Sequence, residues 1–275
     1  MPSLPRLTQA RCDLTRQIEV VDEQGVRTLV DIPAERALTI YVDKQELVTL
    51  MTLGANPELL VLGYLRNQRL VSAVTDIESI TVDWEAGEGG AGVAAVRTHA
   101  GIDDLRARTD KRVITTGCGQ GSVFGDWMAN LDDLQVPKST ITSARLHDLL
   151  NTIRLQETIY KTAGTVHGCA LFMGDALCLY EEDVGRHNAI DVIAGWMWMH
   201  HLRAGGDAVF YTTGRLTSEM VLKSAQMGIG LVVSRNGITQ MGYDLAERLG
   251  LCAIGRARNK RFLVYTAHEC VLTGV

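Results

Sequence analysis

The feature that most constrains the fold is an alternation of strand-like and helix-like segments through the second half of the chain. Short apolar runs rich in valine, isoleucine and leucine are followed by segments with apolar residues at helical spacing. Such alternation is typical of α/β domains, in which helices pack on the faces of a mixed sheet. The expected strands are 113–116, 170–172, 176–180, 207–212, 231–233 and 252–254, and the expected helices are 143–161, 188–202, 218–227 and 239–249.

The N-terminal part has a different pattern, dominated by strands. Short apolar runs within 18–50 and at 77–84 predict strands. One helix is expected at 56–65, where Asn56 is placed to cap the first turn and Pro57 suits the first helical position.

The chain length and one glycine-rich stretch suggest two unequal domains. A chain of 275 residues with 46% apolar and 21% charged residues is long enough for a sizeable core and typical of globular proteins. The stretch 85–92 is rich in glycine and is either a linker or the tip of a hairpin. We therefore predict a β-rich N-terminal domain over 1–105 and an α/β domain over 106–275.

Charge and hydropathy argue against several partners. The net charge of −5 gives no reason to expect nucleic acid or an anionic membrane as a partner. The first residues contain no apolar signal-peptide core, and the most apolar stretch, 190–199, is too short to span a bilayer. We expect a cytoplasmic protein, whose six cysteines are mostly free thiols.

Cys118 is the strongest candidate for a reactive residue. Glycines at 117, 119 and 121 would leave its sulfur accessible and expose backbone N–H groups that help to hold a thiolate, the nucleophilic form. A cysteine packed in a glycine-rich turn is the structural alternative. Cys178 and Cys252 lie in apolar strand-like runs and are expected to be buried.

Two strand-like runs end in the same tripeptide. Thr-Thr-Gly precedes Cys118 and also precedes Arg215. Ligands of open α/β sheets lie beyond the strand ends, so the two turns could place both side chains on one rim. The alternative is a chance match between two ordinary turns.

A dense polar run opens the helix expected from residue 188. Asp183, His187 and Asp191 would share one face if the helix began early, and Arg186 and Asn188 would add donors at an end that favours anions. The alternative is a capping cluster in which Asp183 or Asn188 satisfies N–H groups of the first turn. A metal site here is disfavoured, because a single helix offers too few convergent ligands.

Two further segments carry candidate binding residues. The stretch 255–261 holds four positive side chains, and guanidinium groups grip phosphate bidentately. The alternative is an ordinary basic loop that is exposed to solvent and binds nothing. His167 lies in a glycine-flanked segment and could orient or deprotonate a substrate group, or could be a structural histidine.

Taken together, these motifs resemble the FdhD-type formate dehydrogenase accessory sulfurtransferases over nearly the whole chain and in the same order. The matching motifs are Ile114-Thr-Thr-Gly-Cys-Gly119, Gly164-Thr-Val-His167, Asp183-Val-Gly-Arg-His-Asn-Ala-Ile-Asp191, Thr213-Gly-Arg-Leu-Thr-Ser-Glu219 with Lys223, and Gly255-Arg-Ala-Arg258 through Val264-Tyr-Thr266.

The resemblance implies a function and a fold. Proteins of this family take persulfide sulfur from a cysteine desulfurase and pass it to the bis-molybdopterin guanine dinucleotide molybdenum cofactor, which is then inserted into the formate dehydrogenase apoenzyme. The implied fold is a cytidine-deaminase-like α/β domain without the deaminase zinc site, with a smaller β-rich N-terminal part, usually in a homodimer. The sequence lacks the His-x-Glu and Cys-x-x-Cys zinc signatures, as this fold without zinc requires.

The resemblance also assigns candidate residues. By motif position Cys118 would carry the persulfide. The guanine nucleotide moiety of the cofactor would be held by a basic loop, and a second group of side chains would complete the cofactor site. The loop is Arg256, Ala257, Arg258, Asn259, Lys260 and Arg261, and the second group is His167, Arg186, His187 and Arg215.

One departure from the family pattern leaves alternatives open. Family members commonly have a second cysteine where this chain has Gly121, so a loop disulfide that resolves the persulfide is in doubt unless Cys169 takes that role. A cofactor-binding chaperone that moves no sulfur is the main alternative. A third hypothesis is an unrelated cysteine enzyme with Cys118 as acyl nucleophile and His167 or His187 as base.

Overall fold

The computed structural model describes residues 3–87, 90–102, 113–114, 121–122, 131, 134–156 and 158–272, so Cys118 lies outside the described residues. The strands are β1 Arg6–Leu7, β2 Thr15–Val21, β3 Arg27–Pro33, β4 Arg36–Val42, β5 Gln45–Thr52, β6 Ile77–Asp83, β7 Gly92–Thr98, β8 Val113–Ile114, β9 Gly121–Ser122, β10 Ile141–Thr142, β11 His167–Met173, β12 Ala176–Asp183, β13 Ala208–Thr212, β14 Leu231–Ser234, β15 Cys252–Arg258, β16 Arg261–Val264 and β17 Val271–Leu272. The α-helices are α1 Pro57–Asn67, α4 Ser143–Leu155, α5 Ile159–Ala163, α6 Arg186–Met199, α7 Ser218–Gln226 and α8 Gln240–Leu249, and short 3₁₀ turns lie at Val74–Asp76 and His268–Cys270.

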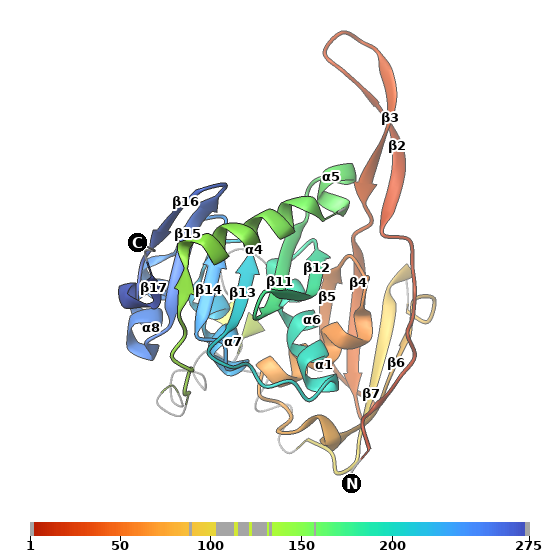
Figure 1. Ribbon diagram of the computed structural model, residues 1–275. Helices are drawn as coiled ribbons and strands as arrows, with labels where there is room; N and C mark the ends of the chain where they lie inside the picture. The colour runs from red at the N-terminus through yellow and green to blue at the C-terminus, as the bar shows by residue number, and fades with distance from the viewer. Residues whose placement is uncertain are drawn as a thin grey trace.

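The N-terminal strands build a five-stranded sheet in the order β1-β6-β7-β4-β5 (Figure 1). Alternate residues of β4, namely Leu38, Ile40 and Val42, are buried on one face of this sheet, against α1. Asn56 is at the N-cap of α1 but does not cap it with its side chain; its Nδ2 instead donates to Glu181 Oε2 at 2.8 Å. The expected capping bond is therefore wrong, because a buried carboxyl from β12 competes for the amide.

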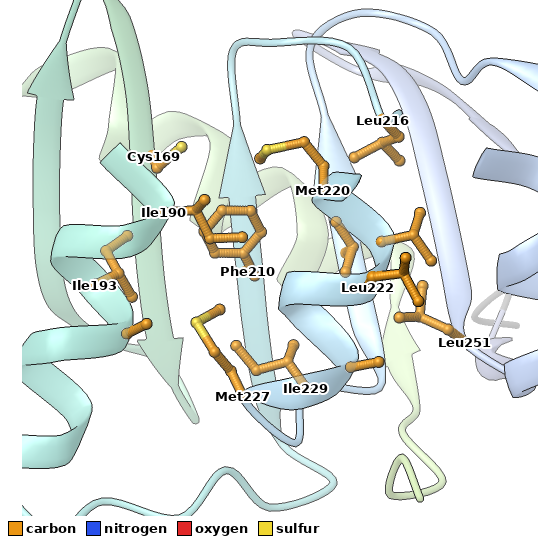
Figure 2. Packing of buried hydrophobic residues seen from close by; sticks show 14 of the residues in the cluster. Cys169, Ile190, Ile193, Phe210, Leu216, Met220, Leu222, Met227, Ile229 and Leu251 are labelled. Carbon is orange, nitrogen blue, oxygen red and sulfur yellow. The ribbon is translucent and has the colours of Figure 1, made fainter. Parts of the chain in front are cut away.

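The C-terminal half builds a six-stranded mixed sheet in the order β12-β11-β13-β14-β15-β16. Strands β13, β14 and β15 are parallel, and the outer strands pair with them as antiparallel hairpins. Helices α6 and α7 cover one face, where Ile190, Phe210 and Met220 pack together (Figure 2). Helix α4 covers the other face, with Leu146 and Leu149 buried there. The predicted α/β fold with helices on a mixed sheet is confirmed.

Helices α1 and α6 pack directly on each other between the two sheets (Figure 1). Two glycines allow this close approach. A Cβ atom added at Gly63 would lie 1.7 Å from the backbone oxygen of Asp191, and one added at Gly195 would lie 2.1 Å from the backbone oxygen of Leu59. Because backbone meets backbone here, the spacing between the N-terminal sheet and the C-terminal sheet is rigidly set.

One expectation about the elements needs correction, and a second stays untested. The single helix expected over 143–161 is two helices, because the backbone of Gln156 is extended and Thr158 starts a new helix by accepting a hydrogen bond from the N–H of Lys161. Whether the two Thr-Thr-Gly turns share one rim stays a prediction, because residues 115–120 lie outside the described residues. Strand β8 pairs with β9 in a separate two-stranded sheet, whereas β13 lies in the six-stranded sheet.

Strands β2 and β3 form a two-stranded arm that extends away from the rest of the molecule (Figure 1). Its register places Ile18 opposite Val30 and Arg16 opposite Ile32, so apolar side chains gather on one face of the ribbon. Val30 and Ile32 are each 37% exposed on that face.

Two sequence predictions about organisation have different outcomes. The glycine-rich stretch 85–92 lies between the antiparallel strands β6 and β7, at the end of a hairpin. The division into domains 1–105 and 106–275 stays a prediction, because most of 103–133 is outside the described residues. In the described ranges, no helix has the length and apolar character needed to cross a membrane.

Candidate functional site

A cavity of about 610 Å³ opens on the face of the six-stranded sheet that carries α4. Its walls are α4, α5, the ends of the central strands and the β15–β16 hairpin. Of the residues that the structure describes, five basic side chains and three tyrosines line it, which makes it both positively charged and aromatic. The basic residues are Arg154, Lys161, Arg235, Arg258 and Lys260, and the tyrosines are Tyr160, Tyr180 and Tyr211.

The β15–β16 hairpin presents part of the basic loop to this cavity. A bulge between Gly255 and Arg258 shifts the strand register, and Arg256 adopts a left-handed backbone with φ of 51°. Buried Ala257 anchors the loop, and the guanidinium of Arg258 donates to the backbone oxygen of Arg235 at 3.4 Å. The turn residues 259 and 260 complete the cavity wall.

The opposite wall comes from α5 and from the turn after β14. Glu182 of β12 holds the start of α5, because its Oε2 accepts from the N–H of Ile159 at 2.6 Å. This anchoring places Tyr160 beside Arg235, whose guanidinium carbon lies 5.9 Å from the ring centroid. The neighbouring Lys161 also lines the cavity.

Three cavity residues were not predicted from the sequence, namely Arg235, Tyr160 and Lys161. A signal for Arg235 was available, because it directly follows β14, a parallel strand whose end marks the usual ligand position. Nothing in the sequence brings α5 to the same place, because its approach depends on the tertiary bond from Glu182.

Two cavity tyrosines keep their hydroxyl protons at neutral pH. Burial raises the pKa of Tyr211 to about 12, and burial followed by the charge of Glu182 raises the pKa of Tyr180 as well. Both side chains therefore offer neutral rings. The hydroxyl of Tyr180 donates a hydrogen bond to Glu182 Oε1 at 3.3 Å. Aromatic faces beside guanidinium groups are suited to a planar, negatively charged ligand.

A second polar cluster lies on the other face of the same sheet. Gly168 lines the cavity, so the adjacent His167 points to the opposite face, together with Cys169. Burial lowers the pKa of His167, and the positive charges of Arg186 and Arg215 lower it further, so the imidazole is neutral at pH 7. Arg186 passes over Gly214, where an added Cβ would lie 2.6 Å from its Cδ.

Helices α6 and α7 bury four titratable side chains between them. Lys223 Nζ lies 2.8 Å from Asp191 Oδ2, and both residues are fully buried. His187 Nε2 lies 3.3 Å from Glu219 Oε2. Burial lowers the pKa of His187 well below its usual value, with the charges of Lys223 and Arg186 acting in the same direction, so His187 is neutral.

Asp183 connects the N-terminal sheet to this region. The proposed helical alignment of Asp183 with His187 and Asp191 is wrong, because Asp183 belongs to β12 and α6 begins at Arg186. Its carboxylate accepts from the hydroxyl of Thr52, the N–H of Leu53, the N–H of Gly185 and the amide of Asn188. The capping alternative is not borne out for Asp183 either, because it accepts from the N–H of Gly185, which precedes the first turn of α6, and from the side-chain amide of Asn188.

The structure therefore divides the predicted site residues into groups. Ala257, Arg258, Asn259 and Lys260 line the cavity, whereas the exposed Arg256 and Arg261 are not among its lining residues. His167, Arg186, His187 and Arg215 lie on the other face of the strands. Cys118 falls outside the described residues.

Among the other cysteines, Cys169 and Cys252 are buried, whereas Cys12, Cys178 and Cys270 are half-buried. Cys169 is fully buried, burial raises its pKa to about 12, and its sulfur contacts Thr212 Oγ1 at 3.3 Å. It is therefore protonated and covered in this conformation, which does not favour a role as resolving thiol. Cys252 is buried as predicted, whereas Cys178 is half-buried rather than buried.

Comparisons with known proteins agree on one family. Residues 33–272 match the model of the FdhD/NarQ family. A protein from Bacillus licheniformis named sulfur carrier protein FdhD is 31% identical over 240 residues, covering 86% of this chain and 88% of the relative. A protein of the same name from Geobacillus kaustophilus is 29% identical and covers 89% of this chain and 91% of its own length.

A solved structure is similar over almost the whole chain. It comes from Desulfotalea psychrophila and carries the name of a formate dehydrogenase accessory protein. The TM-score is 0.72 with 25% sequence identity, and the match covers 94% of this chain and 98% of the other.

Proposed function

Because this chain belongs to the FdhD/NarQ family, we propose that it is a sulfur carrier needed for formate dehydrogenase activity. In this proposal it accepts persulfide sulfur from a cysteine desulfurase and transfers it to the bis-molybdopterin guanine dinucleotide molybdenum cofactor. The sulfurated cofactor then enters the formate dehydrogenase apoenzyme. The relatives' name, sulfur carrier protein, supports the first part of this proposal.

The observation that carries the cofactor part is the cavity beside the basic loop. Its volume of about 610 Å³ accommodates a nucleotide, and its basic and aromatic lining suits a ligand with a planar base and phosphates. We propose that Arg235, Arg258 and Lys260 bind the phosphates of the guanine nucleotide end. Guanidinium groups can grip phosphate oxygens in pairs, which gives orientation as well as affinity.

The sulfur chemistry is assigned to Cys118. Its thiolate attacks the terminal sulfur of the desulfurase persulfide, the S–S bond of the desulfurase breaks, and the desulfurase cysteine leaves as a thiolate. Cys118 then holds the sulfur as Cys118–S–SH and passes it on to the cofactor. We propose that the neutral His167 and the cations Arg186 and Arg215 bind the part of the cofactor that lies outside the cavity, with the buried His187 beside Glu219 behind them.

A second function remains in competition, a chaperone that binds the cofactor and delivers it without moving sulfur. The absence of a second loop cysteine at Gly121 is the observation that favours it. Both functions need the cavity, so they differ only in what they require of Cys118.

Reversing one charge in the cavity tests the cofactor part. We expect Arg258→Glu to weaken binding of guanosine diphosphate, measured by calorimetry, by about 10- to 100-fold, because a charge-assisted bond to phosphate is lost and a repulsive charge replaces it. The matched control is Arg203→Glu, which makes the same charge change at an exposed residue that does not line the cavity. Equal affinities for the wild type and Arg258→Glu would contradict the assignment.

We also propose that the chain works in the cytoplasm as a homodimer and that the β2–β3 arm contributes to the interface. A two-stranded ribbon is only marginally stable by itself, so its apolar face, with Ile18 and Val30, needs a covering surface.

One substitution on each face of the arm tests this interface. We expect Val30→Asp to weaken dimerisation at least tenfold, because burying an unpaired carboxylate costs several kcal/mol. Leu29→Asp, on the opposite face and 64% exposed, should leave the dimer intact. Light scattering across a dilution series measures the result, and a monomeric wild type would refute the proposal.

A further inference from the structure

We propose that α4 recognises the guanine base, through the carboxylate of Asp148 and the side-chain amide of Asn151. This inference rests on the proposed function, because it takes the cavity to be the site of the guanine nucleotide end of the cofactor. It adds the residues that distinguish guanine from other bases, beside the cations that hold the phosphates.

Among the described residues, the carboxylate of Asp148 in this cavity has no hydrogen-bond or ion-pair partner. Asp148 and Glu182 are the carboxylates among its described lining residues. Glu182 is occupied, since it accepts from the N–H groups of Ile159 and Tyr160 and from the hydroxyl of Tyr180. At Asp148 the hydrogen bond within the described residues uses the backbone carbonyl, which accepts from Thr152 Oγ1 at 3.0 Å.

Asp148 is exposed on α4, where it lines the cavity. Within the described part of the chain, its carboxylate forms no ion pair with any of the five basic lining residues. Arg154 also lies on α4, whereas Arg235, Arg258 and Lys260 lie at the strand turns. A nucleotide with the donors of its base at Asp148 and its phosphates at the strand turns would match this distribution.

Asn151 lies one helical turn from Asp148 on the same face of α4. Its Oδ1 accepts from Arg154 Nη2 at 2.8 Å and from Arg154 Nε at 3.3 Å. Because an arginine side chain only donates, this contact assigns the oxygen of the amide and leaves Nδ2 as a hydrogen-bond donor. Asp148 and Asn151 thus supply acceptor oxygens and an amide donor from one helix.

That arrangement complements guanine and not adenine. Guanine presents the donors N1–H and N2–H₂ beside the acceptor O6, so a carboxylate can accept both donors while the amide donates to O6. Adenine places a donor where O6 would be and an acceptor at N1, which would face the carboxylate repulsively. The helix is held firmly for this role, because Leu146 and Leu149 are buried against the sheet and Arg145 binds the β11–β12 turn.

A change of base preference tests the inference. Calorimetry with the full chain compares guanosine, xanthosine and adenosine diphosphates. We expect the wild type to bind guanosine diphosphate at least about tenfold more tightly than the other two, since a bidentate base contact gives discrimination of that order. Xanthine carries a carbonyl oxygen in place of the N2 amino group, so Asp148→Asn should lose guanosine diphosphate affinity and prefer xanthosine diphosphate.

The control is Asp244→Asn, which removes the same charge from an exposed residue of α8 outside the cavity. It should keep the wild-type preference. If the wild type binds no nucleotide, the proposed function of the cavity fails and this inference fails with it. If the wild type binds all three nucleotides equally, or Asp148→Asn keeps its preference for guanosine, the inference is overturned while the phosphate site stands.

Discussion

A Cys118→Ala protein is expected to gain no sulfur and to leave formate dehydrogenase inactive. Incubation with a cysteine desulfurase and cysteine should add the mass of one sulfur to the wild type and nothing to the variant, as measured by mass spectrometry of the intact chain. The reason is chemical, because no other residue in the loop 117–121 can be a sulfur nucleophile. The cofactor cavity should be unaffected, so guanosine diphosphate affinity stays at the wild-type value.

Sulfur gain and formate dehydrogenase activity, measured together, distinguish the sulfur carrier from the chaperone. A chaperone that moves no sulfur would support full formate dehydrogenase activity with Cys118→Ser, and that outcome would refute the sulfur carrier. A control at Cys178, half-buried on β12, removes another partly accessible thiol. Cys178→Ala should gain sulfur as the wild type does. Sulfur gained by Cys118→Ala would instead point to another thiol.

The second large effect is on stability. We expect Lys223→Met to lower the free energy of unfolding by about 3–5 kcal/mol, because it leaves the fully buried Asp191 without its cation. Urea unfolding followed by tryptophan fluorescence measures the loss. Asp191 also accepts a hydrogen bond from Asn67 Nδ2 at 2.7 Å. The substitution therefore affects a place where α1, α6 and α7 are in contact.

The pH dependence of that variant gives an independent check. Burial raises the pKa of Asp191 in the wild type, and Lys223 opposes this effect. Without Lys223 the folded-state pKa rises further above the unfolded value, so the folded state binds the proton more tightly. The penalty should then shrink as the pH is lowered. The double variant Lys223→Met/Asp191→Asn keeps an acceptor for Asn67 and should recover most of the loss. A single variant as stable as the wild type would contradict the ion pair.

Local sequence patterns predicted most of the elements correctly. Apolar periodicity located the strands and helices of the six-stranded sheet within a few residues, because period and burial are coupled in a regular element. The break at Gln156 between α4 and α5 was missed, because the position of α5, which Thr158 caps, also depends on the bond of Ile159 to Glu182, 23 residues away. The pairing of β8 with β9 rather than with the six-stranded sheet could not be predicted for a similar reason, since pairing partners are chosen by the tertiary fold.

The candidate site was predictable only in part. The basic loop was visible because four positive charges lie within seven residues. The sequence did not show that this loop is separated from His167, Arg186 and Arg215. Adjacent residues of a strand, such as 167 and 168, face opposite sides of the sheet, and different helices cover those two sides.

By itself the sequence determined the class of fold, the glycine-flanked Cys118 and the family, since these depend on residue type, spacing and order along the chain. Only the tertiary structure decided which charges are buried in pairs, as in Lys223 with Asp191, and which line a common cavity, as in Arg235 with Arg258. The physical reason is that burial and pairing depend on distances between segments far apart in sequence, and those distances are set by packing such as the contact of Gly63 with α6.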